Sequence, residues 1–95
     1  MDHTLSPLYT QLTALAAKHG AQKLVLFGSR ARGDYWRASD IDLAVWGGDI
    51  QNFAFDVDEE TSTLLKYDVI DMDKGVQEEL RESIDREGIV LYEEV

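Results

Sequence analysis

A short apolar run, LVLF at residues 24–27, stops at Gly28-Ser29 and constrains the fold more than any other feature of the sequence. Uninterrupted apolar residues over such a length are typical of a central strand that is covered on both faces. A strand of this kind needs neighbouring strands and covering layers, so the rest of the chain must supply both.

The other expected elements follow from hydrophobic periodicity and from helix-end signals. Ser6-Pro7 is typical of a helix start, and Gly20 is typical of a helix end. The full set is a helix from Ser6 to Gly20 with a stripe of Leu5, Leu8, Leu12, Leu15 and His19, strands at 23–27 and 40–46, a helix at roughly 50–65, a strand Tyr67–Met72, a helix marked by Val76, Leu80 and Ile84 that ends at Gly88, and a strand Ile89–Tyr92. This order predicts an α/β or α+β layer fold.

Composition places the chain among small globular proteins. We expect a single domain over residues 1–95, because this length suffices for one hydrophobic core. The sequence holds no stretch of about 18 uninterrupted apolar residues, and its N-terminus lacks the basic and apolar regions of a secretory signal. Without cysteine there are no disulfides or zinc–thiolate sites. These features favour a cytoplasmic protein that does not span a membrane.

The formal net charge of −10 weighs against the binding of long nucleic acid, because phosphate contacts need a basic surface. The same charge suits a small-molecule enzyme or a module that docks on a basic partner. Taken alone, it is most simply explained by solubility.

Asp40 and Asp42 lie in the alternating segment on one strand face, with Cβ atoms about 6.6 Å apart at ~3.3 Å per residue. The opposite face carries Ile41, Leu43 and Val45, so a one-residue slip would bury both carboxylates. Paired carboxylates suit magnesium, which usually lies between one or two carboxylates and substrate phosphates. An isolated acidic pair is, however, more often part of a solvated edge strand.

The Gly28-Ser29 corner supplies the second half of such a site. A strand that ends in Gly-Ser before a helical turn presents backbone N–H groups and a hydroxyl to a phosphate. Gly28 would let the ligand approach the backbone, and Ser29 would donate to a phosphate oxygen. Together with the acidic pair, this corner predicts a site for a nucleoside triphosphate and magnesium.

The spacing of these residues resembles a known signature. Gly28-Ser29, ten residues, then Asp40-Ile41-Asp42 is similar to the G-S-x10-D-x-D pattern of the DNA polymerase beta-type nucleotidyltransferase superfamily. The string GSRARGDYWRASDIDLAV resembles the minimal nucleotidyltransferases (MNT), which include the MntA-like antitoxins of HEPN/MNT toxin–antitoxin pairs. The resemblance covers nearly the whole chain. It implies the nucleotidyltransferase fold, a mixed sheet of about four strands flanked by helices.

Proteins of this family carry a third carboxylate on a later strand, and the string KYDVIDMDK offers several. Periodicity places Asp68 on one face with Ile70, and Asp71 on the other with Val69 and Asp73, so spacing leaves the choice open. The resemblance aligns the family's third aspartate with Asp68, because YDVI matches the family's string. Asp71 is the alternative.

The resemblance implies transfer of AMP from ATP with two magnesium ions. The first two carboxylates of the signature would bind both ions. The third would bind the ion that activates the acceptor hydroxyl, so the expected catalytic and metal-binding residues are Asp40, Asp42 and Asp68. The expected nucleotide-binding residues are Gly28, Ser29 and Arg30.

Four residues near the signature permit more than one interpretation. Arg30 or Arg32 could neutralise phosphate, and Arg30 is the stronger candidate because it follows Ser29 directly. Both could instead pair with surface acids. Tyr35 and Trp36 could stack on a base, anchor a partner or fold back onto the core.

The resemblance also implies a partner. Members of the family commonly pair with a HEPN-domain RNase toxin and, as antitoxins, add AMP to one of its tyrosines, so we expect a hetero-oligomer. Larger relatives carry a helical domain for the acceptor, for which 95 residues leave no room. Two alternatives stay open. One is a non-catalytic module that neutralises its partner by contact, and the other is a small-molecule adenylyltransferase completed by a helical subunit.

Overall fold

The computed structural model describes residues 6–36, 39–60 and 65–94. Each helix and strand expected from the sequence is found, and a short helix, α2, follows the first strand. The predicted helix at 50–65 is described from Ile50 to Glu60, whereas residues 61–64 and Leu5 lie outside the described residues. The elements are α1 (Ser6–Lys18), β1 (Lys23–Phe27), α2 (Ser29–Arg32), β2 (Ile41–Trp46), α3 (Ile50–Glu60), β3 (Tyr67–Asp71), α4 (Glu78–Glu87) and β4 (Ile89–Glu93).

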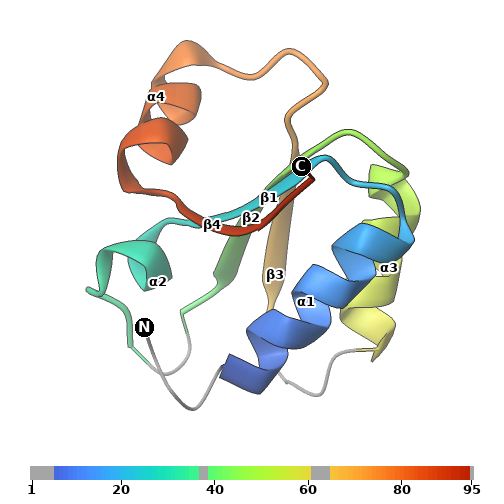
Figure 1. Ribbon diagram of the computed structural model, residues 1–95. Helices are drawn as coiled ribbons and strands as arrows, with labels where there is room; N and C mark the ends of the chain where they lie inside the picture. Colours follow the sequence, from blue (N-terminus) through green and yellow to red (C-terminus); the bar gives the residue numbers. More distant parts are fainter. Residues whose placement is uncertain (1–5, 37–38, 61–64, 95) are drawn as a thin grey trace.

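The strands form one mixed sheet in the order β3-β2-β1-β4. Strand β1 pairs antiparallel with both β2 and β4, whereas β2 pairs parallel with β3. The prediction of a central strand at 24–27 is therefore confirmed. A parallel pair needs a crossover connection, and α3 lies in the connection between β2 and β3 (Figure 1).

Helices cover both faces of the sheet (Figure 1). Helices α1 and α3 pack side by side on one face, α4 lies over the other, and α2 lies beyond the end of β1. None of the helices in the described ranges combines the length and the apolar character that a membrane crossing requires.

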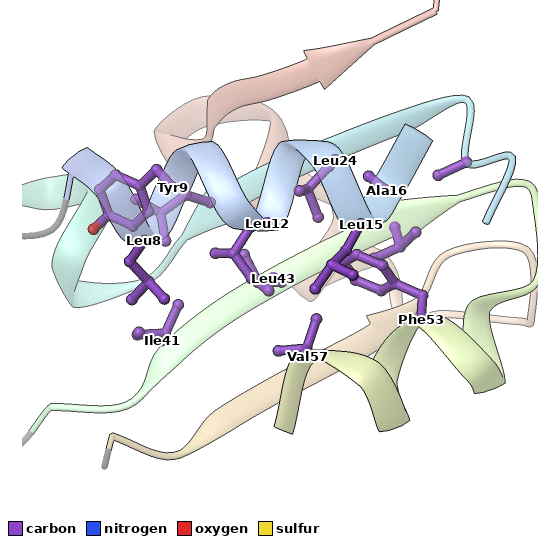
Figure 2. Packing of buried hydrophobic residues seen from close by; sticks show 13 residues of the cluster. Leu8, Tyr9, Leu12, Leu15, Ala16, Leu24, Ile41, Leu43, Phe53 and Val57 are labelled. Carbon is purple, nitrogen blue, oxygen red and sulfur yellow. The ribbon is translucent and has the colours of Figure 1, made fainter. Parts of the chain in front are cut away.

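The larger core lies between the sheet and helices α1 and α3 (Figure 2). Leu12 of α1 and Phe53 of α3 are fully buried, and burial of such a side chain stabilises the fold by about 1.5–3 kcal/mol. The buried members are Leu8, Tyr9, Leu12, Leu15, Ala16, Ala21, Leu24, Leu26, Ile41, Leu43, Val45, Phe53 and Val57.

A smaller core lies on the opposite face of the sheet, beneath α4. Val25 and Phe27 of β1 enter this core, whereas the intervening Leu24 and Leu26 enter the larger one. This alternation is why β1 is apolar throughout. On β2, Ala44 belongs to the smaller core, so every second residue of that strand faces the α4 side.

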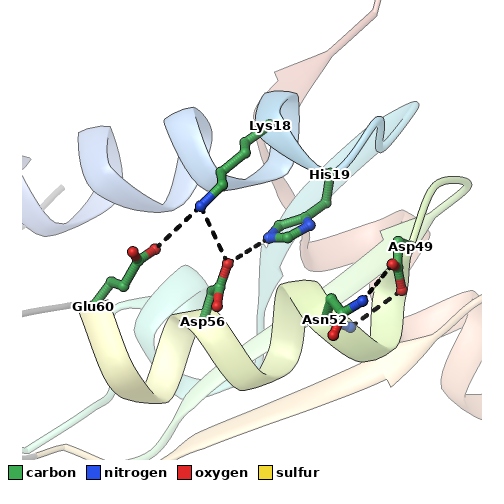
Figure 3. A network of polar contacts seen from close by, with 6 residues as sticks. All are labelled: Lys18, His19, Asp49, Asn52, Asp56 and Glu60. Atoms are coloured by element: carbon green, nitrogen blue, oxygen red, sulfur yellow. Dashed lines mark hydrogen bonds and ion pairs between the residues drawn. The ribbon is translucent and has the colours of Figure 1, made fainter.

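A polar network joins the end of α1 to α3 (Figure 3). The His19 ring nitrogen Nε2 lies 2.6 Å from Asp56 Oδ2, and Lys18 Nζ lies 3.5 Å from the same oxygen. The hydrogen bond with His19 lowers the pKa of Asp56, with Lys18 adding to the effect. The backbone N–H of Asp49 donates to the His19 carbonyl at 2.9 Å. Sequence analysis placed His19 on the stripe of this helix but did not identify these partners on α3.

Candidate active site

Two of the three expected carboxylates meet across neighbouring strands. Asp42 of β2 and Asp68 of β3 are register partners in the parallel pair, so their side chains leave the sheet on the same face. Asp40 precedes β2 and lies two residues before Asp42 along the chain. Asp42 and Asp68 therefore lie on the α4 side, at the edge of the smaller core, and Asp40 is near enough for its charge to act on Asp42.

Asp71 lies on the opposite face of β3. Its neighbours two and four residues back, Val69 and Tyr67, pack against the larger core, whereas Ile70 packs against the smaller one. Asp71 accepts a hydrogen bond from the backbone N–H of Asp73 at 3.0 Å. It also lines a separate cavity of about 340 Å³ beside the start of α3. The structure therefore brings Asp68, and not Asp71, next to Asp42.

The electrostatics of Asp42 reflect this crowding. Burial raises the pKa of the Asp42 carboxyl, and the negative charges of Asp68 and then Asp40 raise it further. The positive charge of Arg32 acts in the opposite direction. Two nearby negative charges disfavour the ionised form of this half-buried carboxyl, and a cation placed between the carboxylates would stabilise it.

Hard oxygen donors of this kind fit magnesium. Within the described ranges, no group of three acidic or histidine side chains is already close enough to enclose a metal ion. Magnesium does not need a closed protein cage, because it keeps several waters and binds through one or two carboxylates together with substrate phosphates. The donor set formed by Asp40, Asp42 and Asp68 therefore fits an open, substrate-assisted magnesium site.

The Gly28 corner is built around Asp42. Gly28 has a φ of 77° and a ψ of −156°, a conformation that is essentially restricted to glycine. A Cβ on Gly28 would collide with the Asp42 carboxylate oxygen Oδ2. The sequence predicts that the missing side chain of Gly28 lets a ligand approach the backbone. In the structure, the space is filled by the carboxylate itself, which lies against the Gly28 backbone.

Ser29 begins α2 directly beyond this contact and is half-buried. The Gly28 carbonyl accepts hydrogen bonds from the N–H groups of Ala31 and Arg32, at 3.1 Å and 3.0 Å. These bonds close the helical turn that the sequence suggested. The Gly28-Ser29 corner thus lies directly beside the Asp42 carboxylate.

The two arginines of α2 have different surroundings. Arg30 is only 7% exposed, and its guanidinium donates to the Ser39 carbonyl. The expectation that Arg30 neutralises phosphate stays a prediction, and Arg30 also lines the pocket beside α2. Arg32 is more exposed and forms ion pairs with Asp34 at 3.1 Å and Glu87 at 3.0 Å, which in that order raise its pKa. Arg32 is also the arginine whose charge acts on Asp42.

The aromatic residues of the following loop also differ from each other. Tyr35 is half-buried, and its ring lies 4.7 Å from the guanidinium carbon of Arg30. Trp36 is 71% exposed. A pocket of about 390 Å³ lies between this loop, α2 and β4, and Arg32 and Tyr35 contribute to its wall. The three aspartates do not line that pocket.

The sequence is similar to known nucleotidyltransferases. The sequence profile of a family described as "Polymerase beta, Nucleotidyltransferase" matches residues 10–95. The Methanocaldococcus jannaschii protein MJ0604, which is named as a candidate protein adenylyltransferase, is 36% identical to this chain over 92 residues. The match covers 85% of this chain and 90% of that protein.

Solved structures share the fold. A proposed minimal nucleotidyltransferase is 30% identical with a TM-score of 0.73, and the match covers 94% of this chain and 95% of that one. A toxin–antitoxin structure with AMP-PNP has a TM-score of 0.70 at 22% identity, and an MntA-HpeT toxin–antitoxin variant has 0.69 at 20%. Each of these two matches covers 90% of this chain and 73% of the other. The mixed sheet with its flanking helices is thus a nucleotidyltransferase fold.

Proposed function

Since the chain belongs to the polymerase beta nucleotidyltransferase family, we propose that it transfers AMP from ATP to a hydroxyl group of a partner protein. The observation that carries this proposal is the register pairing of Asp42 with Asp68 beside the Gly28-Ser29 corner. This arrangement combines a corner for phosphate with carboxylates for magnesium, which are the parts that phosphoryl-transfer chemistry requires.

In the proposed reaction, the oxygen of the acceptor hydroxyl forms a bond to the α-phosphorus of ATP. The bond from that phosphorus to the bridging oxygen breaks, and pyrophosphate leaves. Asp68 accepts the hydroxyl proton, while the Gly28-Ser29 corner orients the phosphates and Arg32 lies nearby as a positive charge. Asp40, Asp42 and Asp68 would hold magnesium, which when bound offsets the negative charge of the triphosphate.

The proposed acceptor is a tyrosine hydroxyl on a HEPN-domain RNase toxin, for which this protein acts as the antitoxin. Three observations support this choice. The name of the M. jannaschii relative proposes a protein adenylyltransferase, and two structural neighbours are toxin–antitoxin proteins, one of them with AMP-PNP. A net charge of −10 also complements the basic surface of a protein that binds RNA.

Intact-mass spectrometry of the partner after incubation with this protein, ATP and magnesium tests the proposal. We expect the partner to gain mass in AMP-sized steps on a hydroxyl side chain and to lose its RNase activity in parallel. Asp42→Asn should abolish the mass gain while circular dichroism shows an intact fold, because Asp42 is a ligand on the sheet surface and not part of the apolar core.

Three results would redirect the assignment. An unmodified partner that is nevertheless inhibited in a stable complex would support a binding module that acts by contact. AMP on a small molecule in a mixed-metabolite assay, with an unmodified partner, would support a small-molecule adenylyltransferase. An oligonucleotide extended in the same mixture would contradict the argument from net charge.

A further inference from the structure

Arg30 is the only charged side chain in the described part of the protein that is buried, at 7% exposure. A guanidinium taken out of water is costly unless its N–H groups are satisfied, so its contacts indicate what it does. Its Nε and Nη2 both donate to the Ser39 carbonyl, at 3.1 Å and 3.0 Å. Its guanidinium carbon lies over the Tyr35 ring, 4.7 Å from the ring centre.

These contacts connect α2 to the end of the loop that precedes β2. Ser39 is also tied to Trp36, because the Ser39 N–H donates to the Trp36 carbonyl at 2.9 Å and the Trp36 N–H donates to Ser39 Oγ at 3.1 Å. Arg30 therefore holds Ser39, nine residues further along the chain, while Tyr35 lies against the guanidinium.

Ser39 directly precedes Asp40, which lies just before the first residue of β2. On the other side of Asp40, the Ile41 N–H donates to the Lys66 carbonyl at 2.9 Å. This bond ties Ile41 to the segment that leads into β3. Asp40 is thus held between two anchors, one formed by the sheet and the other by the Arg30 guanidinium.

We propose that Arg30 is a positioning residue for nucleotidyl transfer, which holds the Ser39 carbonyl so that the Asp40 carboxylate stays beside Asp42. The inference rests on the proposed function, because it assumes that Asp40 and Asp42 act together. It assigns the two arginines of α2 to different tasks. Arg32 supplies exposed positive charge near the carboxylates, and Arg30 supplies geometry.

The geometry requires arginine in particular. A guanidinium offers several N–H donors in one plane and stacks on an aromatic ring, whereas a lysine ammonium is a compact point charge. Arg30→Lys therefore keeps the charge but loses both the paired donors and the planar contact with Tyr35. If Arg30 acted through its positive charge on a phosphate, Arg30→Lys would keep most of the transfer activity.

The test compares Arg30→Lys with Tyr35→Leu and with Arg32→Gln as the matched control on the same helix. Supporting partners of metal ligands typically change metal affinity or activity by about 10–100-fold. We expect Arg30→Lys to lower kcat by roughly tenfold or more with little change in KM for ATP, and Tyr35→Leu to act in the same direction. Arg32→Gln should instead raise KM for ATP.

Two measurements without nucleotide make the inference independent of transfer activity. In a Trp46→Phe background, Trp36 reports on the loop, and its fluorescence anisotropy should fall in Arg30→Lys but not in Arg32→Gln. Affinity for Mn²⁺ alone, measured from the electron paramagnetic resonance signal of the free ion, should also fall in Arg30→Lys. Thermal unfolding monitors whether each variant folds.

The outcomes separate the two proposals. If wild-type protein transfers no nucleotide, the proposed function fails, while the anisotropy and Mn²⁺ data still decide whether Arg30 positions Asp40. Unchanged anisotropy and Mn²⁺ affinity in folded Arg30→Lys would overturn the positioning role. A further variant, Arg30→Met, removes the positive charge. If Arg30→Met raises only KM for ATP and Arg30→Lys restores that KM, the positioning role is also overturned, and Arg30 would instead bind the phosphates through its charge.

Discussion

Replacing Gly28 with alanine tests the contact on which the site is built. The conformation of Gly28, with φ 77° and ψ −156°, costs another residue about 1–3 kcal/mol. The new Cβ would also collide with the Asp42 carboxylate, and overpacking of this kind costs about another 1–3 kcal/mol. The sum of roughly 2–6 kcal/mol is a large share of the ~5–15 kcal/mol by which a domain is usually stable.

Gly33, at the other end of α2, provides the matched control. Its φ of 91° and ψ of 5° are also left-handed, but an added Cβ there would meet nothing within 4 Å. Gly33→Ala should therefore cost only about 1–2 kcal/mol, from the backbone alone. At about 4–8 °C per kcal/mol, Gly28→Ala should lower Tm by at least about 8 °C and by more than Gly33→Ala does.

Chemical unfolding followed by circular dichroism, in buffer without divalent metal, measures these losses and also their coupling. Residues in contact typically show interaction energies of about 0.5–3 kcal/mol. The double variant Gly28→Ala/Asp42→Ala should thus be more stable than the sum of its single losses predicts, because the colliding carboxylate is gone. Equal losses for Gly28→Ala and Gly33→Ala, together with an additive double variant, would refute the collision.

Four further predictions concern the carboxylates and the core. In metal-free buffer at neutral pH, Asp42→Asn should raise Tm, because the folded protein raises the pKa of the Asp42 carboxyl. The stability linked to a raised pKa is complete at low pH and is lost as the pH rises through the folded-state pKa. The increase in Tm should therefore become smaller in acid, and a difference in Tm that does not depend on pH would contradict the prediction. Asp68→Asn should lower the AMP transfer rate by orders of magnitude in a labelled-ATP assay while Asp71→Asn has a mild effect, and the reverse order would show that the wrong face of β3 was chosen. Asp56→Asn should destabilise the protein at neutral pH and lose this effect as the pH falls through the lowered pKa of Asp56, which Tm measured against pH would reveal. Phe53→Ala should cost about 3–5 kcal/mol in chemical unfolding, because Phe53 is fully buried in the larger core, and a loss below about 1 kcal/mol would contradict that burial.

The elements and the central strand could be predicted because they depend on local pattern. The apolar run at 24–27 indicates burial on both faces, and Leu24 and Val25 do enter different cores. Alternation in β2 likewise predicts that Ile41 and Leu43 face one layer, as the structure shows. Such signals need no knowledge of which segments meet.

Placement of the site residues depends on contacts between distant segments, and periodicity does not encode these. It separates Asp68 from Asp71 but does not say which face of β3 meets Asp42, since this follows from the parallel register with β2. The adjacency of Arg30 to Ser29 suggested a phosphate contact, yet its side chain folds back to Ser39. Arg30 and Tyr35 lie five residues apart and can form a cation–π contact, which is a signal in the sequence that could have indicated this packing.

The alternation of β2 has a consequence for how proteins of this kind can change over time. Ile41, Leu43 and Val45 are fully buried against α1 and α3, while Asp42 projects from the other side of the same strand. Substitutions of Ile41, Leu43 or Val45 are therefore tested by folding, whereas under the proposed function a substitution of Asp42 is tested by chemistry. One replacement at Asp42 is expected to leave a stable, inactive protein whose remaining surface is intact. A lineage that begins with an enzyme thus has a short mutational route to an inhibitor that acts by binding alone.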